Sequence, residues 1–118
     1  MIRKKINIDV FSRSLEFIIT EDMIKEIEFL KKRDKIDLDL VDAEGICIPG
    51  NNGKYYILIH KSCVSYNTIS HEIFHASSGI CEDINIEDEE TKAWVCGYLS
   101  GSIYRHLAEQ NITIIHGN

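Results

Sequence analysis

The chain begins with a strict alternation of apolar and polar side chains. Within residues 4–11, one face carries three apolar residues, namely Ile6, Ile8 and Val10. A period of two is typical of a half-buried strand. Residues 12–14 then indicate a turn, and residues 15–20 predict a second strand that returns alongside the first. We therefore expect the N-terminal segment to form a pair of strands.

A helical period follows the second predicted strand. We expect Thr20 to cap a helix, with Glu21 and Asp22 placed favourably near the positive end of its dipole. The apolar stripe of this helix consists of Met23, Ile24, Ile27 and Leu30. Its basic C-terminal end leads into residues 34–42, where apolar residues alternate with charged ones and predict a short strand.

A hairpin is the clearest feature in the middle of the chain. Residues 45–48 and 54–61 are its predicted arms, and the loop between them, residues 49–53, consists of proline, glycine and asparagine. The second arm contains the run Tyr-Tyr-Ile-Leu-Ile. Because β-branched and aromatic side chains favour strands, this arm is the most strand-like segment of the chain.

Two helices are predicted after the hairpin. The first covers residues 66–78 and ends at Gly79, because glycine readily adopts the left-handed conformation that terminates helices. The second covers residues 88–109, and residues 111–118 are expected to form a short strand or a loose tail. These elements predict an α+β fold, in which a small, mostly antiparallel sheet packs on the two C-terminal helices and one further helix lies near the N-terminus.

Length and composition limit the classes of function. The 118 residues suit one domain, residues 1–118, and a hydrophobic content of 44% can build its core. The net charge of −6, from 13 basic and 19 acidic residues, argues against a nucleic-acid-binding surface. No apolar stretch approaches the roughly 20 residues of a membrane span, and no signal-peptide core follows the N-terminus. We expect a cytoplasmic protein that does not associate with membranes.

The cysteines agree with this location. Cys47, Cys63, Cys81 and Cys96 are far apart in the sequence and form no CxxC pair. In a reducing compartment, such cysteines usually serve as small apolar residues of the core.

An HExxH motif, His71-Glu72-Ile73-Phe74-His75, lies inside the first of the two C-terminal helices. Residues four apart are one turn above each other on a helix, so both imidazoles point to the same side and can share one metal ion. Glu72, beside the first histidine, can reach a water molecule at the metal without binding the metal itself. The motif therefore predicts a zinc site with His71 and His75 as ligands and Glu72 as a general base.

A catalytic zinc site usually has a third protein ligand, for which we select Glu90. Glu90 lies in the first turn of the last predicted helix and begins a stripe that continues through Ala93, Trp94, Gly97 and Gly101. The small residues of this stripe predict that it faces inward and lets the helix approach the HExxH helix closely. The alternatives are Glu87, Glu89, Cys81, His106 and His116.

The pairing of HExxH with Glu90-Thr91-Lys92-Ala93 resembles the gluzincin metallopeptidases, which combine HExxH with a glutamate in an E-x-x-A or E-x-x-S setting. More narrowly, the chain resembles the short ImmA/IrrE-like and phage-encoded metallopeptidases and the minimal single-domain gluzincins. The resemblance covers roughly residues 45–105. It implies a minimal zincin-like domain with an edge strand beside the HExxH helix, a place that we assign to Tyr55–His60.

The resemblance also implies an activity, namely zinc-dependent hydrolysis of peptide bonds by an endopeptidase that acts on a protein or peptide partner. Zn²⁺ is the expected cofactor, held by His71, His75 and Glu90. The small size of the chain favours substrate capture through a homo-oligomer or an accessory protein. Three residues are candidates for stabilising the oxyanion, and the choice among them stays open: Tyr98, Tyr104 and His106.

Two hypotheses from other classes compete with the peptidase. The first is a catalytically silent zinc-binding protein with a regulatory or interaction role, favoured by the small size of the chain. The second is an α/β interaction domain without metal. The metal content of the purified protein distinguishes them, because only the second predicts none.

Overall fold

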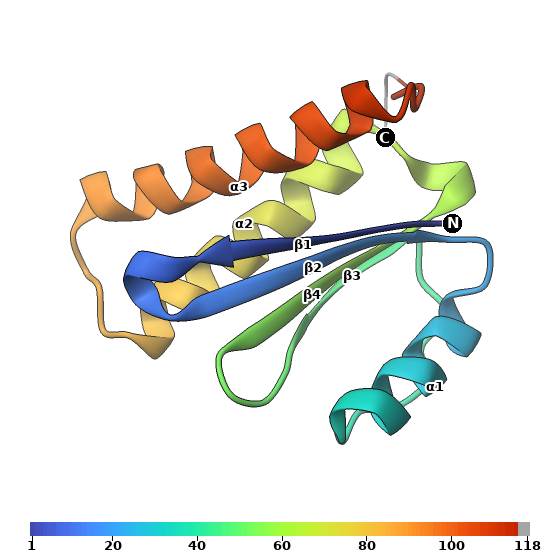
Figure 1. Ribbon diagram of the computed structural model, residues 1–118, viewed down its shortest axis with the longest axis horizontal. Helices are drawn as coiled ribbons and strands as arrows, with labels where there is room; N and C mark the ends of the chain where they lie inside the picture. The colour runs from blue at the N-terminus through green and yellow to red at the C-terminus, as the bar shows by residue number, and fades with distance from the viewer. Residues whose placement is uncertain (116–118) are drawn as a thin grey trace.

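A computed structural model describes residues 1–115. A four-stranded sheet separates one helix from the two others, as Figure 1 shows. The strands are β1 (Ile2–Ile8), β2 (Arg13–Thr20), β3 (Gly45–Pro49) and β4 (Lys54–His60). The helices are α1 (Met23–Asp34), α2 (Tyr66–Asp83) and α3 (Glu89–Glu109), with two short 3₁₀ helices, η1 (Asp9–Phe11) and η2 (Lys61–Cys63). The predicted α+β class is confirmed at this level.

The sheet is mixed, with the strand order β1-β2-β4-β3. The pairs β1–β2 and β3–β4 are antiparallel, as the alternation and the hairpin loop predict. The central pair, β2–β4, is parallel, and α1 lies in the crossover between these two strands. This order leaves β3 at one edge of the sheet and β4 inside it.

Strand β4 is buried on both faces, which explains its continuous apolar sequence. Tyr55, Ile57 and Ile59 pack in the core shared with α2 and α3. Tyr56 and Leu58 pack in a second core beneath α1. In Figure 1, α2 and α3 therefore cover one face of the sheet and α1 covers the other. Within residues 1–115, no helix has both the length and the apolar content needed to cross a bilayer.

The start of α1 differs from the prediction. Asp22, not Thr20, is the N-cap, because its carboxylate accepts the backbone N–H of Lys25 at 3.1 Å. The hydroxyl of Thr20 instead accepts the N–H of Asp22 at 3.2 Å and fixes the turn before the helix. Ile24, assigned to the apolar stripe, is exposed, while the rest of that stripe is buried.

Three other boundaries are also wrong. The strand predicted over residues 4–11 ends at Ile8, where the chain enters η1 and leaves Val10 exposed. The short strand predicted within residues 34–42 is absent: Asp34 ends α1, and the segment that follows links α1 to β3 and pairs with no strand among the described residues. Helix α2 continues through Gly79 to Asp83.

Packing explains the glycine inside α2. A Cβ atom at Gly79 would lie 3.2 Å from the ring of Tyr55, so the helix approaches β4 closely at this turn. The hydroxyl of Tyr55 donates to Asp83 at 2.6 Å and lies 3.1 Å from the carbonyl oxygen of Gly79. The glycine that indicated a helix end thus marks a close contact between helix and sheet.

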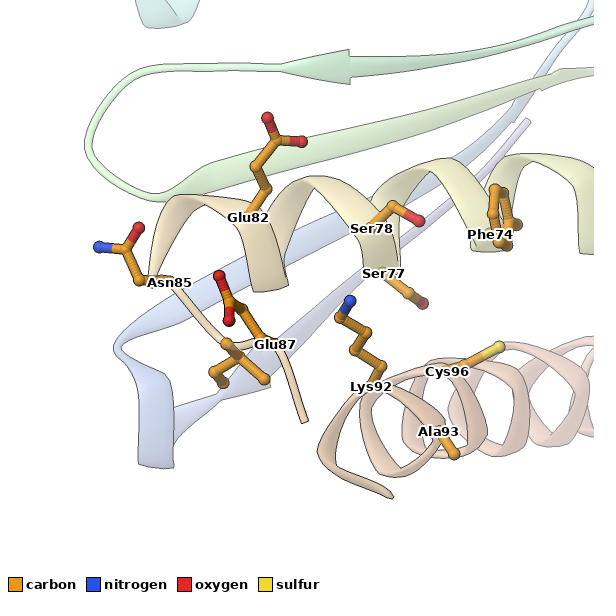
Figure 2. A pocket seen from close by; sticks show the side chains of 10 residues that line it. Phe74, Ser77, Ser78, Glu82, Asn85, Glu87, Lys92, Ala93 and Cys96 are labelled. Carbon is orange, nitrogen blue, oxygen red and sulfur yellow. The ribbon is translucent and has the colours of Figure 1, made fainter. Parts of the chain in front are cut away.

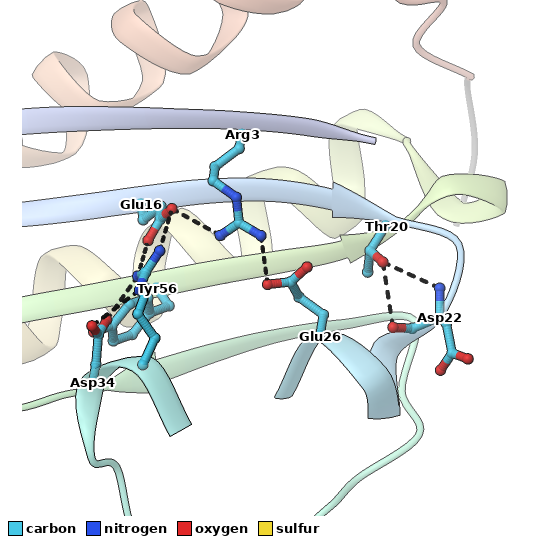
Figure 3. Close-up of polar contacts among 8 residues, drawn as sticks. Arg3, Glu16, Thr20, Asp22, Glu26, Asp34 and Tyr56 are labelled. Atoms are coloured by element: carbon cyan, nitrogen blue, oxygen red, sulfur yellow. Dashed lines mark hydrogen bonds and ion pairs between the residues drawn. The ribbon is translucent and has the colours of Figure 1, made fainter. Parts of the chain in front are cut away.

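A network of charged residues connects α1 to the sheet, as Figure 3 shows. Arg3 bridges Glu16 at 2.8 Å and the buried Glu26 at 2.7 Å. Arg33 pairs with Glu16 at 2.5 Å and with Asp34 at 2.7 Å, and Asp34 also accepts the hydroxyl of Tyr56. The hydrogen bonds from Arg33 hold the pKa of Asp34 at about 2. Burial acts to raise the pKa of the Glu16 carboxyl. The hydrogen bonds from Arg33 and Arg3 outweigh this effect, so the pKa of Glu16 is lowered overall.

We predict that acid weakens the fold through this network. Because Asp34 has a lower pKa in the folded state than in the unfolded state, its contribution to stability is complete above pH 4, approximately, and disappears as the pH falls towards about 2. Urea unfolding across this range should show a falling free energy of unfolding in the wild type and a shallower fall in Asp34→Asn. The matched control is Asp37→Asn, at an exposed position. An unchanged pH slope in Asp34→Asn would contradict the assignment.

Candidate metal centre

Helix α2 presents the HExxH residues because its inner face is apolar. Ser65 caps the helix and accepts the N–H of Thr68 at 3.1 Å. The residues that turn into the core are Ile69, Ile73, Ala76 and Ile80. This orientation leaves His71 and His75 exposed, while Glu72, one position on from His71, is buried.

The two imidazoles converge as the spacing predicts. Their Nε2 atoms are 3.2 Å apart, and their ring centroids are 4.7 Å apart. Two zinc–nitrogen bonds of about 2.05 Å that span this 3.2 Å separation would meet at an angle of about 103°, close to tetrahedral. The separation of the two imidazole nitrogens is therefore compatible with a shared zinc ion.

Glu72 completes the group. One oxygen of its carboxylate and one nitrogen of each histidine all lie within 4.8 Å of one another. Burial raises the pKa of Glu72, and the charges of His71 and His75 offset part of this rise. Cys47 on β3 lies near this carboxylate: burial raises the pKa of its thiol to about 12, and the charge of Glu72 contributes. Among the described residues, this is the group whose chemistry best suits a metal ion.

The edge strand next to α2 is β3, which corrects the sequence-based assignment. The predicted edge strand Tyr55–His60 lies within β4, which is paired on both sides, so its edges are not available to a substrate. A hollow of about 440 Å³ extends from β3 to the three HExxH side chains, and Cys47 and Pro49 line its β3 side. The free edge of β3 and the histidines therefore face a common space.

Sequence reasoning missed Glu44. It precedes β3 and lines a second hollow of about 320 Å³ together with His71 and Glu72. Its carbonyl oxygen accepts the N–H of His60 at 2.8 Å, which fixes the backbone at this point. Only the placement of β3 beside α2 brings Glu44 to the motif, so no local pattern in the sequence indicates it.

The structure does not bring Glu90 to the histidines. Its side chain is exposed, and it does not belong to the group formed by the HExxH residues. Helices α2 and α3 lie side by side and run in opposite directions (Figure 1), with the hydroxyls of Ser70 and Tyr104 2.9 Å apart. This register places Glu90 roughly 13 Å beyond His75 along the helix axis. Glu90 as a ligand stays a prediction that requires the start of α3 to move.

The stripe that supported Glu90 is exposed, contrary to the prediction. Trp94 is 49% exposed, and a Cβ atom at Gly97 or Gly101 would meet no atom within 4 Å. The inward face of α3 instead consists of Val95, Leu99, Ile103 and Leu107. The small residues predict close packing, but the larger apolar residues of the same helix occupy its buried face.

The other sequence-based candidates occupy different places. Cys81 is buried in the core. Tyr98 donates to the carbonyl oxygen of Asn7 at 2.8 Å, and Tyr104 contacts Ser70. None of the hollows beside the HExxH residues is lined by Glu87, Glu89, Tyr98, Tyr104 or His106, among the residues described. His116 lies outside the described residues.

Comparisons with known proteins found no match for this chain among family models, curated proteins or solved structures. The geometry of the site is therefore the basis for any functional proposal.

Gly45 provides a test of the close contact between β3 and α2. A Cβ atom there would lie 2.9 Å from Thr68 and 3.4 Å from the side chain of Glu72. Gly45→Ala should lower the free energy of unfolding by about 1–3 kcal/mol, because the side chain of Thr68 would have to shift to make room for the added methyl group. Gly101→Ala is the control: it faces open space on a helix and should raise stability by roughly 0.5–1 kcal/mol. Urea unfolding measures both, and equal effects would contradict the close contact.

Proposed function

We propose that the protein is a zinc-dependent peptidase whose centre is formed by His71, Glu72 and His75. The observation that carries this proposal is the 3.2 Å separation of the two Nε2 atoms, with a buried carboxylate beside them and an unpaired strand edge next to the site. The HExxH motif and the zincin-like resemblance support the same function.

The residues around the centre have separate roles in this proposal. His71 and His75 hold the ion, which would polarise a carbonyl group and lower the pKa of a water molecule to about 7. Glu72 would act as the general base for a water molecule at this centre and would return the proton to the leaving amine. An extended peptide can pair with the free edge of β3, which aligns its backbone with the histidines.

A catalytically silent zinc-binding protein is the second candidate. It is favoured by one observation: the three HExxH residues form the metal group on their own, without a third ligand from α3. Catalytic zinc sites usually have three protein ligands, so a centre without the third ligand departs from the catalytic pattern. Hydrolysis by the zinc-loaded protein is the property that separates the two candidates.

Zinc binding tests the ligand set before any substrate is known. We expect the zinc content of purified His71→Ala and His75→Ala to fall at least tenfold below that of the wild type, since each variant loses one of two imidazole ligands. Elemental analysis after dialysis against buffer without chelator measures this content. Stoichiometric zinc in both variants would exclude a site at this pair.

Glu90→Ala belongs in the same experiment. The exposed position of Glu90 and its distance along α3 lead us to expect nearly wild-type zinc content in this variant. A loss as large as that of His71→Ala would instead show that α3 rearranges on metal binding and supplies the third ligand.

Glu72→Gln separates metal binding from catalysis. The amide has the size of the carboxylate but is not a base, so we expect zinc content and melting temperature near those of the wild type and at least a hundredfold loss of peptide hydrolysis. Hydrolysis is followed with a library of fluorogenic peptides, and the matched control is Glu28→Gln, at an exposed position of α1. Full activity in Glu72→Gln would refute the proposed role of Glu72.

A further inference from the structure

A second hollow lies on the side of α2 that faces α3. It has a volume of about 550 Å³, within the usual range for small-molecule sites. Figure 2 shows side chains of both helices around it, with Ser77 and Phe74 on α2 and Lys92 and Cys96 on α3. We call it the interhelical groove. His71, Glu72 and His75 do not line this groove, although Phe74, from the same motif, does.

The hydroxyl of Ser77 is the first sign that the interhelical groove binds a ligand. Ser77 is 5% exposed, and its oxygen has no hydrogen-bond partner within the described chain. A buried hydroxyl without a partner is unfavourable, so native proteins nearly always satisfy it with protein, water or ligand. In Figure 2 this hydroxyl is directed towards α3, across the groove.

Lys92 is the second sign. Its side chain extends from the first turn of α3 towards α2, as Figure 2 shows. None of the ion pairs found in residues 1–115 involves Lys92. Its charge acts on Cys81: burial raises the pKa of the Cys81 thiol, and Lys92 offsets part of that rise. The ammonium group of Lys92 enters the groove and the hydroxyl of Ser77 lies in its wall, so both can donate to an anion that packs against this wall.

The other residues that line the groove indicate the remaining chemistry of the ligand. Apolar surface comes from Phe74, Ile86, Ala93 and Cys96. Two carboxylates, Glu82 and Glu87, also line the groove, and in Figure 2 the carboxylate of Glu82 points away from Lys92. Lys92 can compensate one negative charge on a ligand, and the two acidic groups disfavour a second one. One anionic group attached to an apolar body matches the groove best.

We propose that the interhelical groove binds a monocarboxylate attached to an apolar body, with Lys92 and Ser77 holding the carboxylate and Phe74 packing on the apolar part. Charge-assisted hydrogen bonds to a carboxylate are stronger than neutral ones, so the ammonium and the hydroxyl supply most of the specificity. Two sources share this chemistry: the C-terminal end of a peptide and a free small acid. The site does not require the metal centre.

Calorimetric titration of the wild type tests the proposal with two pairs of probes. Acetyl-alanyl-leucine represents a peptide end and phenylbutyrate a small acid, and the control for each is its primary amide. We expect at least one acid to bind saturably and at least tenfold more tightly than its amide. Preference for the peptide acid identifies a peptide end as the ligand, and preference for phenylbutyrate identifies a small acid. Equal binding of acid and amide, or no binding of either acid, overturns the proposal.

Substitutions test whether the acid binds in the interhelical groove. Lys92→Met should weaken binding of the acid at least tenfold and Ser77→Ala about threefold, while Lys32→Met, which removes one exposed charge on α1, should have no effect. His71→Ala should bind the acid like the wild type, so failure of the proposed metal centre leaves this test intact. Unchanged binding in Lys92→Met would refute the role of Lys92. If that variant does not fold, Ser77→Ala and the comparison of acid with amide still decide.

Discussion

Burial of strand β4 on both faces positions the rest of the fold. Its alternating side chains enter the α2–α3 core on one face and the α1 core on the other. A strand buried in this way belongs inside the sheet, with a partner on each side. The hairpin then leaves β3 as the edge strand, and α2 follows β4 directly through η2. The position of the HExxH helix relative to a free strand edge is a consequence of this one constraint.

Helix α2 uses its surface in four ways. One face packs on the sheet, and the contact is closest where Gly79 meets Tyr55. The side towards β3 carries Glu72, whose burial raises its pKa. The outer surface carries His71 and His75, which remain accessible. The side towards α3 carries Ser77 and lines the interhelical groove. The proposed metal centre and one wall of the interhelical groove are therefore on the same helix.

The N-terminal half of the chain stabilises this arrangement from a distance. Arg3 and Arg33 join β1, β2 and the two ends of α1 through Glu16, Glu26 and Asp34. Because several of these side chains are partly or fully buried, the network is less screened by solvent than ordinary surface pairs. None of these residues lines the hollows beside the histidines. Their role in this structure is to hold α1 on the face of the sheet opposite α2.

Local patterns in the sequence were sufficient to predict the paired histidines, the hairpin and the type of nearly every helix and strand. Helical spacing alone makes residues 71 and 75 neighbours, and a run such as Tyr55–Ile59 favours a strand in any context. Tertiary structure decided which strand lies at the edge, which face of α3 is buried, and that Glu44 rather than Glu90 lies beside the motif. These outcomes depend on contacts between segments distant in the sequence. Gly79, Gly97 and Gly101 show the reason: a small residue permits close approach, but only the packing of neighbouring elements determines whether anything approaches.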